Sequence, residues 1–152
     1  MNSHLPRDCN LSAAASIEDR EAMADLWVAS WSAILPDIDF TARRAWLLAR
    51  FETVPQLVVA KDGAGCILGF ALYDATSGWL DQIAVALDAL GGGVAHRLMT
   101  SVKSACPNGV RLDVNVDNPR AVAFYLREGF RQTGEGTNPS SGLRTLSMQW
   151  TR

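Results

Sequence analysis

Three consecutive glycines stand between an apolar segment and a segment with helical periodicity. Residues 83–90 are mostly apolar, Gly91, Gly92 and Gly93 follow, and residues 94–106 have apolar positions at helical spacing. Glycines at a helix entrance are costly, because glycine loses more backbone entropy on folding than alanine does. The usual reason for bare backbone there is a phosphate held by the free amides and the positive end of the helix dipole. The alternative is a tight turn without a ligand.

A second group of polar residues lies further along the chain. Asn118 and Tyr125 are seven residues apart, which is about two helical turns, so they share one face with Ala121 between them. Pro119 directly follows Asn118, and this pair is typical of a helix start, since Asn caps the helix and Pro loses no hydrogen bond at the first position. A small residue between two polar ones predicts a shallow groove with hydrogen-bonding ends.

Two other phosphate-binding motifs do not fit. A dinucleotide-binding fingerprint needs Gly or Ala where His96 stands. A P-loop needs a Gly-Lys-Ser/Thr sequence, which the chain lacks. Neither motif therefore explains the glycine run.

The two motifs together resemble the signatures of the GNAT (GCN5-related N-acetyltransferase) family. Residues 90–95 are similar to its acyl-CoA pyrophosphate loop, Gln/Arg-x-x-Gly-x-Gly/Ala, and residues 118–130 are similar to its second signature. The resemblance extends over nearly the whole chain and is most specific over residues 79–130. Leu90 departs from the pattern, because the family usually has Gln or Arg there. We hypothesise that His96 or Arg97 supplies a compensating donor or charge; a solvated helix face is the alternative.

The resemblance implies direct transfer of an acetyl group from acetyl-CoA to an amine, without a covalent enzyme intermediate and without a metal. The implied strand at residues 83–85 holds the pantetheine through backbone hydrogen bonds, and one of its amides faces the developing oxyanion. The implied cofactor-binding residues are Ile83, Ala84, Val85, Leu90, Gly91, Gly92, Gly93, Val94, Ala95, His96, Asn118, Ala121 and Tyr125.

Three residues are candidates for the catalytic chemistry. By the resemblance, Tyr125 assists departure of the CoA thiolate; packing beside Phe124 is its alternative role. Asp81 and Asp113 are alternative general bases, and for each of them a surface or loop-capping role is the other interpretation. Strand alternation predicts that Asp81 shares a face with Ile83 and Val85. It likewise places Asp113 on one face with Asn115.

These residues must be positioned by a mixed sheet with helices on its faces. We expect an α+β fold with a mostly antiparallel sheet of six to seven strands and about four helices, the acyl-CoA N-acyltransferase fold. The expected helices are residues 17–34, 41–51, 92–106 and 119–128, and the expected strands are residues 11–15, 56–61, 66–73, 79–87, 110–116, 130–134 and 143–150. Residues 135–142 are expected to form a loop and residues 1–10 a loose tail, within one domain of residues 1–152.

Composition limits the partners. The net charge of −2 and the absence of any Lys/Arg run argue against nucleic acid, and no apolar run is long enough to span a membrane. Three scattered cysteines indicate reduced thiols and therefore the cytoplasm. Dimers are frequent in the family that the chain resembles, which makes a homodimer one assembly to consider.

The acceptor is predicted only as a class, an amine of a small molecule or a peptide. Trp27 and Trp31 lie four residues apart on an expected helix and therefore share a face, where they form an aromatic wall for a substrate or simply part of the core. In the family, loops near residues 35–40 and 135–142 complete the acceptor pocket. The competing hypothesis is a non-catalytic acyl-CoA-binding sensor with the same fold.

Overall fold

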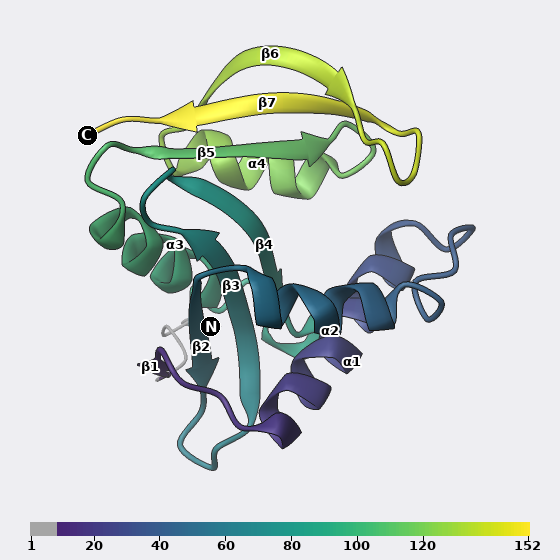
Figure 1. Cartoon of the computed structure of the whole chain (residues 1–152), viewed down its shortest axis with the longest axis vertical. Coiled ribbons are helices and arrows are strands. Elements are labelled where there is room, and N and C mark those ends of the chain that lie inside the picture. Colours follow the sequence, from purple (N-terminus) through teal and green to yellow (C-terminus); the bar gives the residue numbers. More distant parts are fainter. Residues whose placement is uncertain (1–8) are drawn as a thin grey trace, which may run out of the picture.

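The computed structural model describes residues 9–152, which form a seven-stranded sheet in the order β1-β2-β3-β4-β5-β7-β6 (Figure 1). All neighbouring strands are antiparallel except β4 and β5, which are parallel. The strands are β1 (Asn10–Ser12), β2 (Gln56–Lys61), β3 (Ile67–Asp74), β4 (Trp79–Val85), β5 (Val110–Asn115), β6 (Arg131–Thr137) and β7 (Arg144–Trp150). The predicted mixed, mostly antiparallel sheet is therefore confirmed.

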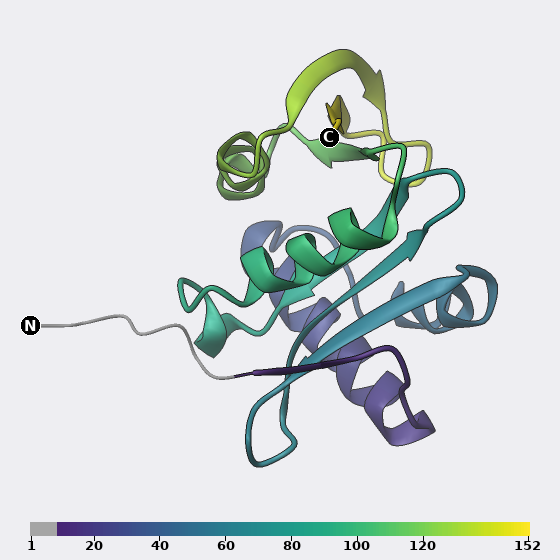
Figure 2. The ribbon, with the colours of Figure 1, turned by 90° about the vertical axis from the view of Figure 1, so that its left-hand side faces the viewer.

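Four α-helices flank the sheet, as predicted (Figures 1 and 2). They are α1 (Ile17–Ile34), α2 (Arg44–Thr53), α3 (Val94–Ala105) and α4 (Pro119–Arg127), and a short 3₁₀ helix, η1 (Leu87–Ala89), follows β4. Helix α1 begins with a capping box between Ser16 and Asp19. Helix α4 begins with the predicted Asn118 cap, whose side chain accepts the Ala121 amide at 3.2 Å.

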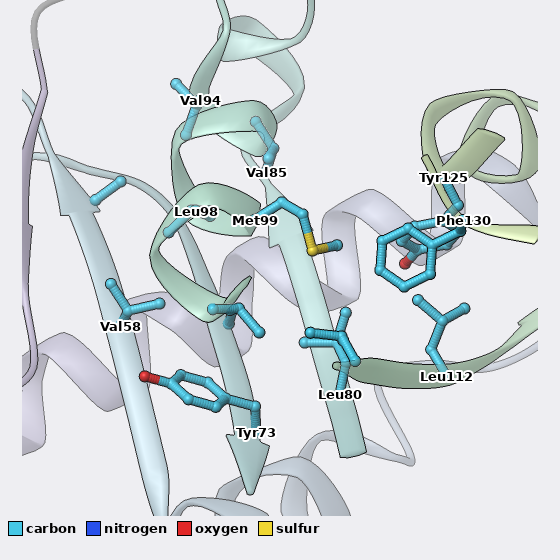
Figure 3. Packing of buried hydrophobic residues seen from close by; sticks show 14 of the residues in the cluster. Val58, Tyr73, Leu80, Val85, Val94, Leu98, Met99, Leu112, Tyr125 and Phe130 are labelled. Atoms are coloured by element: carbon cyan, nitrogen blue, oxygen red, sulfur yellow. The ribbon is translucent and has the colours of Figure 1, made fainter. Parts of the chain in front are cut away.

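The core has two parts, one on each face of the sheet. Met23, Trp27 and Leu47 of α1 and α2 pack against Val59 and other strand residues on one face. The other face carries α3 and α4, whose buried side chains meet strand residues such as Leu80 and Leu112 (Figure 3). Side chains of the covered strands point alternately to the two faces, except where a bulge shifts the register.

Strands β4 and β5 pair only at their beginnings. Trp79 opposite Arg111 is the one register pair between them among the described residues, and the Arg111 amide donates to the Gly78 carbonyl at 2.8 Å. Beyond this point the two strands diverge (Figure 1). Buried apolar side chains gather in the angle between them: Leu80, Met99, Leu112, Tyr125 and Phe130 (Figure 3). The facing edges of β4 and β5 therefore leave their backbone groups without a strand partner.

Several predicted boundaries were wrong. Strand β6 continues to Thr137, through residues that were expected to belong to the 135–142 loop, because Gly134 and Gly136 pair with β7 at an exposed sheet edge. Of the predicted tail, residues 1–8 lie outside the described residues. Cys9 is buried and Asn10 begins β1, paired with Lys61 of β2, so these two positions are not loose.

The turn at Gly78 fixes the point from which β4 and β5 diverge, and it requires glycine. Its φ is +77°, and a Cβ there would lie 2.3 Å from the Gly109 carbonyl oxygen. Gly78→Ala should therefore lower the free energy of unfolding by about 1–3 kcal/mol in urea denaturation. Gly63→Ala is the matched control, because nothing lies within 4 Å of a Cβ there and its φ is not positive. Equal stability of the two variants would contradict the close approach.

Candidate active site

A single continuous cleft of about 1060 Å³ opens where β4 and β5 diverge. Its walls come from α1, the α1–α2 loop, β4, the glycine turn, the start of α3, β5, α4 and the β6–β7 hairpin. Pockets for one small molecule usually measure about 300–1,000 Å³. The cleft is therefore large enough for an extended cofactor together with a second ligand.

The glycine turn presents free backbone donors to this cleft. Gly91 and Gly93 have φ values of +79° and +83°, and Gly93 is the N-cap of α3. The helical hydrogen bonds of α3 begin at Arg97, whose amide donates to the Gly93 carbonyl at 3.1 Å. Within the described part of the chain, the amides of residues 93–96 have no hydrogen-bond acceptor. These donors, at the positive end of a helix dipole, suit an anion such as a phosphate.

The residues predicted around this turn mostly line the cleft. Leu90, Gly91, Gly93, Val94 and Ala95 do so, whereas Gly92 does not. Helix α3 starts at Val94 rather than at the predicted residue 92, because Gly93 has left-handed backbone geometry and cannot be the helix's second residue.

His96 and Arg97 differ in position, although both were hypothesised to compensate for Leu90. His96 lines the cleft, is 66% exposed, and its Nδ1 lies 2.9 Å from both carboxylate oxygens of Glu128. The Arg97 guanidinium instead donates to the carbonyl oxygen and the Sγ of Cys9, and Arg97 does not line the cleft. Of the two residues, only His96 reaches the cleft in this structure.

Along the free edge of β4, the backbone amides and carbonyls of two residues point toward the cleft. The Ala86 amide donates to the Leu68 carbonyl of β3 at 2.8 Å, and antiparallel pairing alternates residue by residue. Ala84 therefore points its amide and carbonyl toward β3. The amides and carbonyls of Ile83 and Val85 point toward the open side, as the predicted backbone recognition requires. All three residues line the cleft.

A β-bulge in β4 overturns the predicted placement of Asp81. Leu72 pairs with Gln82 and Tyr73 with Leu80, so Asp81 is an extra residue without a partner on β3. A bulge turns two consecutive side chains to the same side of the sheet. The Asp81 carboxylate consequently meets α2, where it accepts from the Arg50 Nε at 3.2 Å and from its terminal nitrogen. It does not share the face of Ile83 and Val85, which pack on the α3 side.

Gln82, the next residue, is fixed by α1. The Trp27 indole nitrogen donates to the Gln82 Oε1 at 3.0 Å, so the Gln82 amide nitrogen points elsewhere as a free donor. Trp27, Trp31, Asp81 and Gln82 all line the cleft.

Asp113 on β5 lies on the other wall of the cleft. It faces away from the buried residues Leu112 and Val114, as the alternation with Asn115 predicted. Its Oδ1 accepts from the Ser147 hydroxyl at 2.9 Å, and its side chain is exposed. Asp81 and Asp113 therefore reach the same cleft from opposite strands.

Tyr125 lies on the inner face of α4. Its ring packs between Phe124 and Phe130, with centroid distances of 5.4 and 5.6 Å, and only 7% of the residue is exposed. Tyr125 lines the cleft together with Asn118 and Ala121 of the same helix. Burial raises the pKa of the Tyr125 phenol well above its usual range, so the hydroxyl stays protonated.

The end of the cleft near α1 and α2 is aromatic. Trp27, Trp31, Phe40 and Trp46 line it, together with Arg43. Trp27 and Trp31 were the residues expected to form an aromatic wall, and Phe40 and Trp46 lie beside them. Arg43 was not identified from the sequence, because it stands directly before a helix with no spacing or motif to mark it. Arg50, which holds Asp81, lies inside α2 and was missed because no spacing or motif marks it either.

No cluster of three or more His, Cys, Asp or Glu side chains among the residues that the structure describes could hold a metal ion. Among residues 9–152, no helix combines the length and the apolar character that a membrane span needs.

The chain is similar in sequence to one family model and in fold to many solved structures. The family model described as an acetyltransferase (GNAT) domain matches residues 42–152, which include every cleft element from α2 onward. YjaB from Escherichia coli superposes with a TM-score of 0.80 at 22% identity, over 94% of this chain and 97% of that chain. A GNAT-family acetyltransferase from Staphylococcus aureus Mu50 has a TM-score of 0.76 at 17% identity, over 95% and 99% of the two chains.

A third structure contains a ligand. A Bacillus anthracis protein assigned as a streptothricin acetyltransferase, crystallised in complex with acetyl coenzyme A, has a TM-score of 0.57 at 21% identity, over 64% of this chain and 63% of that chain. At these identities the structural similarities show the fold. No sequence among the curated proteins matches the chain.

The buried tyrosines predict an unusual titration. Desolvation raises the pKa values of both tyrosines of the chain, Tyr125 and Tyr73, and the nearby Cys106 adds to the effect at Tyr73. At pH 10, near the ordinary value, we expect clearly less than half of the tyrosine absorbance of the folded protein to be that of tyrosinate. The protein in denaturant should show about half.

The raised tyrosine pKa values also make the stability of the fold depend on pH. Because the folded state holds the phenol protons more tightly, this contribution to stability is complete below about pH 10 and is lost as the pH rises through the folded pKa values. Tyr125→Phe should leave only the Tyr73 step in the titration. Superimposable titrations of the folded and unfolded protein would contradict the burial of both phenols.

Proposed function

The chain belongs to the GNAT acetyltransferase family, and we propose that it transfers an acetyl group from acetyl-CoA to an amine of a small molecule or peptide. The observation that supports this most strongly is the cleft itself. One continuous space joins the free amides at the start of α3, the free edge of β4 and the Tyr125 side chain. The acetyl coenzyme A bound to the Bacillus anthracis protein of the same fold supports this choice of donor.

The residues present fit acetyl-CoA. The amides of residues 93–96 would hold the pyrophosphate, and the space beside Gly91 is open, since nothing lies within 4 Å of a Cβ there. The backbone groups of Ile83 and Val85 would bind the pantetheine as a further strand would. Ala84 and the α4 residues Asn118 and Ala121 would form the adjoining wall, and His96 would lie beside the phosphates.

The reaction forms a bond between the amine nitrogen and the acetyl carbon and breaks the bond from that carbon to the CoA sulfur. We propose that a β4 amide stabilises the oxyanion that develops on the acetyl oxygen. Tyr125 would donate a hydrogen bond to the departing sulfur. A phenol near pKa 10 is a weaker acid than a thiol near 8.5, so complete proton transfer is uphill by at least about 2 kcal/mol. Burial of Tyr125 widens this gap, so donation of a hydrogen bond precedes transfer.

One of the two carboxylates would accept the proton of the amine, directly or through water. Both oxygens of Asp81 are engaged by Arg50, whereas only the Oδ1 of Asp113 is bonded, to Ser147. We propose Asp113 as the acceptor of the proton and Asp81 as a residue that positions Arg50 and the bulge. The free Oδ2 of Asp113 supports this assignment.

We also propose that the protein acts in the cytoplasm. Cys9, Cys66 and Cys106 are unpaired in the described part of the chain, and Cys66 is exposed. Unpaired thiols are typical of a reducing compartment.

Release of CoA thiol from acetyl-CoA, measured against a panel of amines, tests the proposed function. We expect turnover with at least one class of acceptor. Tyr125→Phe should lower kcat by about 10- to 100-fold with a smaller effect on the KM for acetyl-CoA, because it removes a donor that acts as the sulfur departs. Tyr73→Phe is the matched control, since Tyr73 is also buried but does not line the cleft.

The same assay separates the remaining alternatives. Asp113→Asn should lower kcat by at least about 10-fold and flatten the acidic limb of the pH profile, whereas Asp81→Asn should mainly destabilise the fold by leaving Arg50 unpaired. The reverse pattern would assign the proton to Asp81. Binding of acetyl-CoA without CoA release for any amine would refute catalysis and favour the sensor.

A further inference from the structure

The cleft continues beyond the reacting centre to an end whose walls are aromatic. Trp31 stacks on Phe40, with ring centroids 5.6 Å apart and planes at 19°, and Trp27 lies 6.1 Å from Trp46. Trp27 and Phe40 are buried behind, while Trp46 is 46% exposed and Trp31 is half-buried. Arg50 also lies over the Trp46 ring, 5.5 Å from its centroid, so the aromatic surface offered to a ligand at this end consists of Trp31 and the remaining exposed part of Trp46.

The charge at this end is unbalanced. The Arg43 guanidinium lies over the Phe40 ring, 5.7 Å from its centroid, and makes no ion pair or hydrogen bond to any residue between 9 and 152. Asp81 is the single carboxylate among the cleft residues of α1, α2, β4 and the loop between the helices, and Arg50 already holds it. The lining residues of the β6–β7 hairpin carry no charge.

Two free polar groups at this end are donors without acceptor capacity. Arg43 supplies a guanidinium, and Gln82 supplies its amide nitrogen, because its oxygen accepts from Trp27. A guanidinium binds a carboxylate in a bidentate manner, and this charged pair is stronger than a hydrogen bond from the guanidinium to a neutral group. A polycationic amine would meet the Arg43 guanidinium at this end, where the Asp81 carboxylate is already held by Arg50, so its further charges would be repelled.

Resting on the proposed function, we propose that the acceptor is an amine that also carries an aromatic group and a carboxylate, as in an aromatic α-amino acid. The aromatic group lies against Trp31 and Trp46, and the carboxylate pairs with Arg43. The neutral amine nitrogen then bonds to the acetyl carbon as the bond to the CoA sulfur breaks, and the amine's proton leaves to the base. The products are an N-acetylated amino acid and CoA.

Matched acceptors test this assignment. Phenylalanine and phenethylamine differ by the carboxylate alone, and spermidine represents polycationic amines. We expect kcat/KM for phenylalanine to exceed that for phenethylamine by about 10- to 100-fold, the range of a charged hydrogen-bonded pair. Arg43→Gln should bring this ratio close to one, because it should lower the value for phenylalanine far more than that for phenethylamine. Arg131→Gln is the control, since Arg131 is exposed on β6, outside the cleft.

Other outcomes overturn the assignment while keeping the proposed function. One such outcome is that turnover is fastest with spermidine. Another is that Arg43→Gln changes kcat/KM for both aromatic amines equally, or for neither. If no amine is acetylated although acetyl-CoA binds, the proposed function fails, and calorimetry still tests the pocket.

N-acetylphenylalanine should bind the wild type in the presence of CoA at least about 10-fold more tightly than it binds Arg43→Gln. Equal binding, or no binding to the wild type, contradicts the pocket.

Discussion

The site depends on a single register pair between two parallel strands. Trp79 and Arg111 join β4 to β5 among the described residues, and beyond them the angle is filled by buried apolar side chains from both strands, α3 and α4 (Figure 3). Gly78 permits the close approach at the apex, where its Cβ position is occupied by the Gly109 carbonyl. If the strands paired along their length, the edge of β4 would bond to β5, and neither free backbone groups nor a cleft would remain. The geometry of the sheet therefore creates the binding surface.

Two local departures from regular structure then determine which backbone and side-chain groups face the cleft. The glycine turn leaves amides free at the start of α3, at the end of the cleft that suits phosphates. The bulge at Asp81 turns Asp81 and Gln82 together toward α1 and α2, while Ile83 and Val85 stay with the α3 face. In the proposed function, β4 would bind the cofactor through backbone groups, and the side chains at its beginning would contact the acceptor. The strand could serve both ligands because the alternation of its side chains is interrupted once.

The sequence predicted those features that depend on local patterns. Helical spacing located α3 and its buried stripe, the Asn118–Pro119 pair located the start of α4, and the two motifs placed most of the proposed cofactor residues on one cleft. The divergence of β4 and β5 depends on side chains from four elements, so no single segment encodes it. The bulge at Asp81 contains no glycine that would have predicted it. The glycines of β6 are typical of a loop in sequence, and only their pairing with β7 makes this segment a strand. Arg43 gains its significance only from the rings and the absence of a carboxylate around it.

Amide hydrogen exchange with and without acetyl-CoA tests the central claim most directly. The claim is that this ligand occupies the cleft created by the divergence of β4 and β5, held by backbone groups. The amides of Ile83, Val85 and residues 93–96 should exchange more slowly when acetyl-CoA is bound, because each gains an acceptor that the free protein lacks. The amide of Ala84, which points toward β3, serves as the internal reference. Binding of acetyl-CoA without protection at these amides, or with protection elsewhere, would contradict the claim.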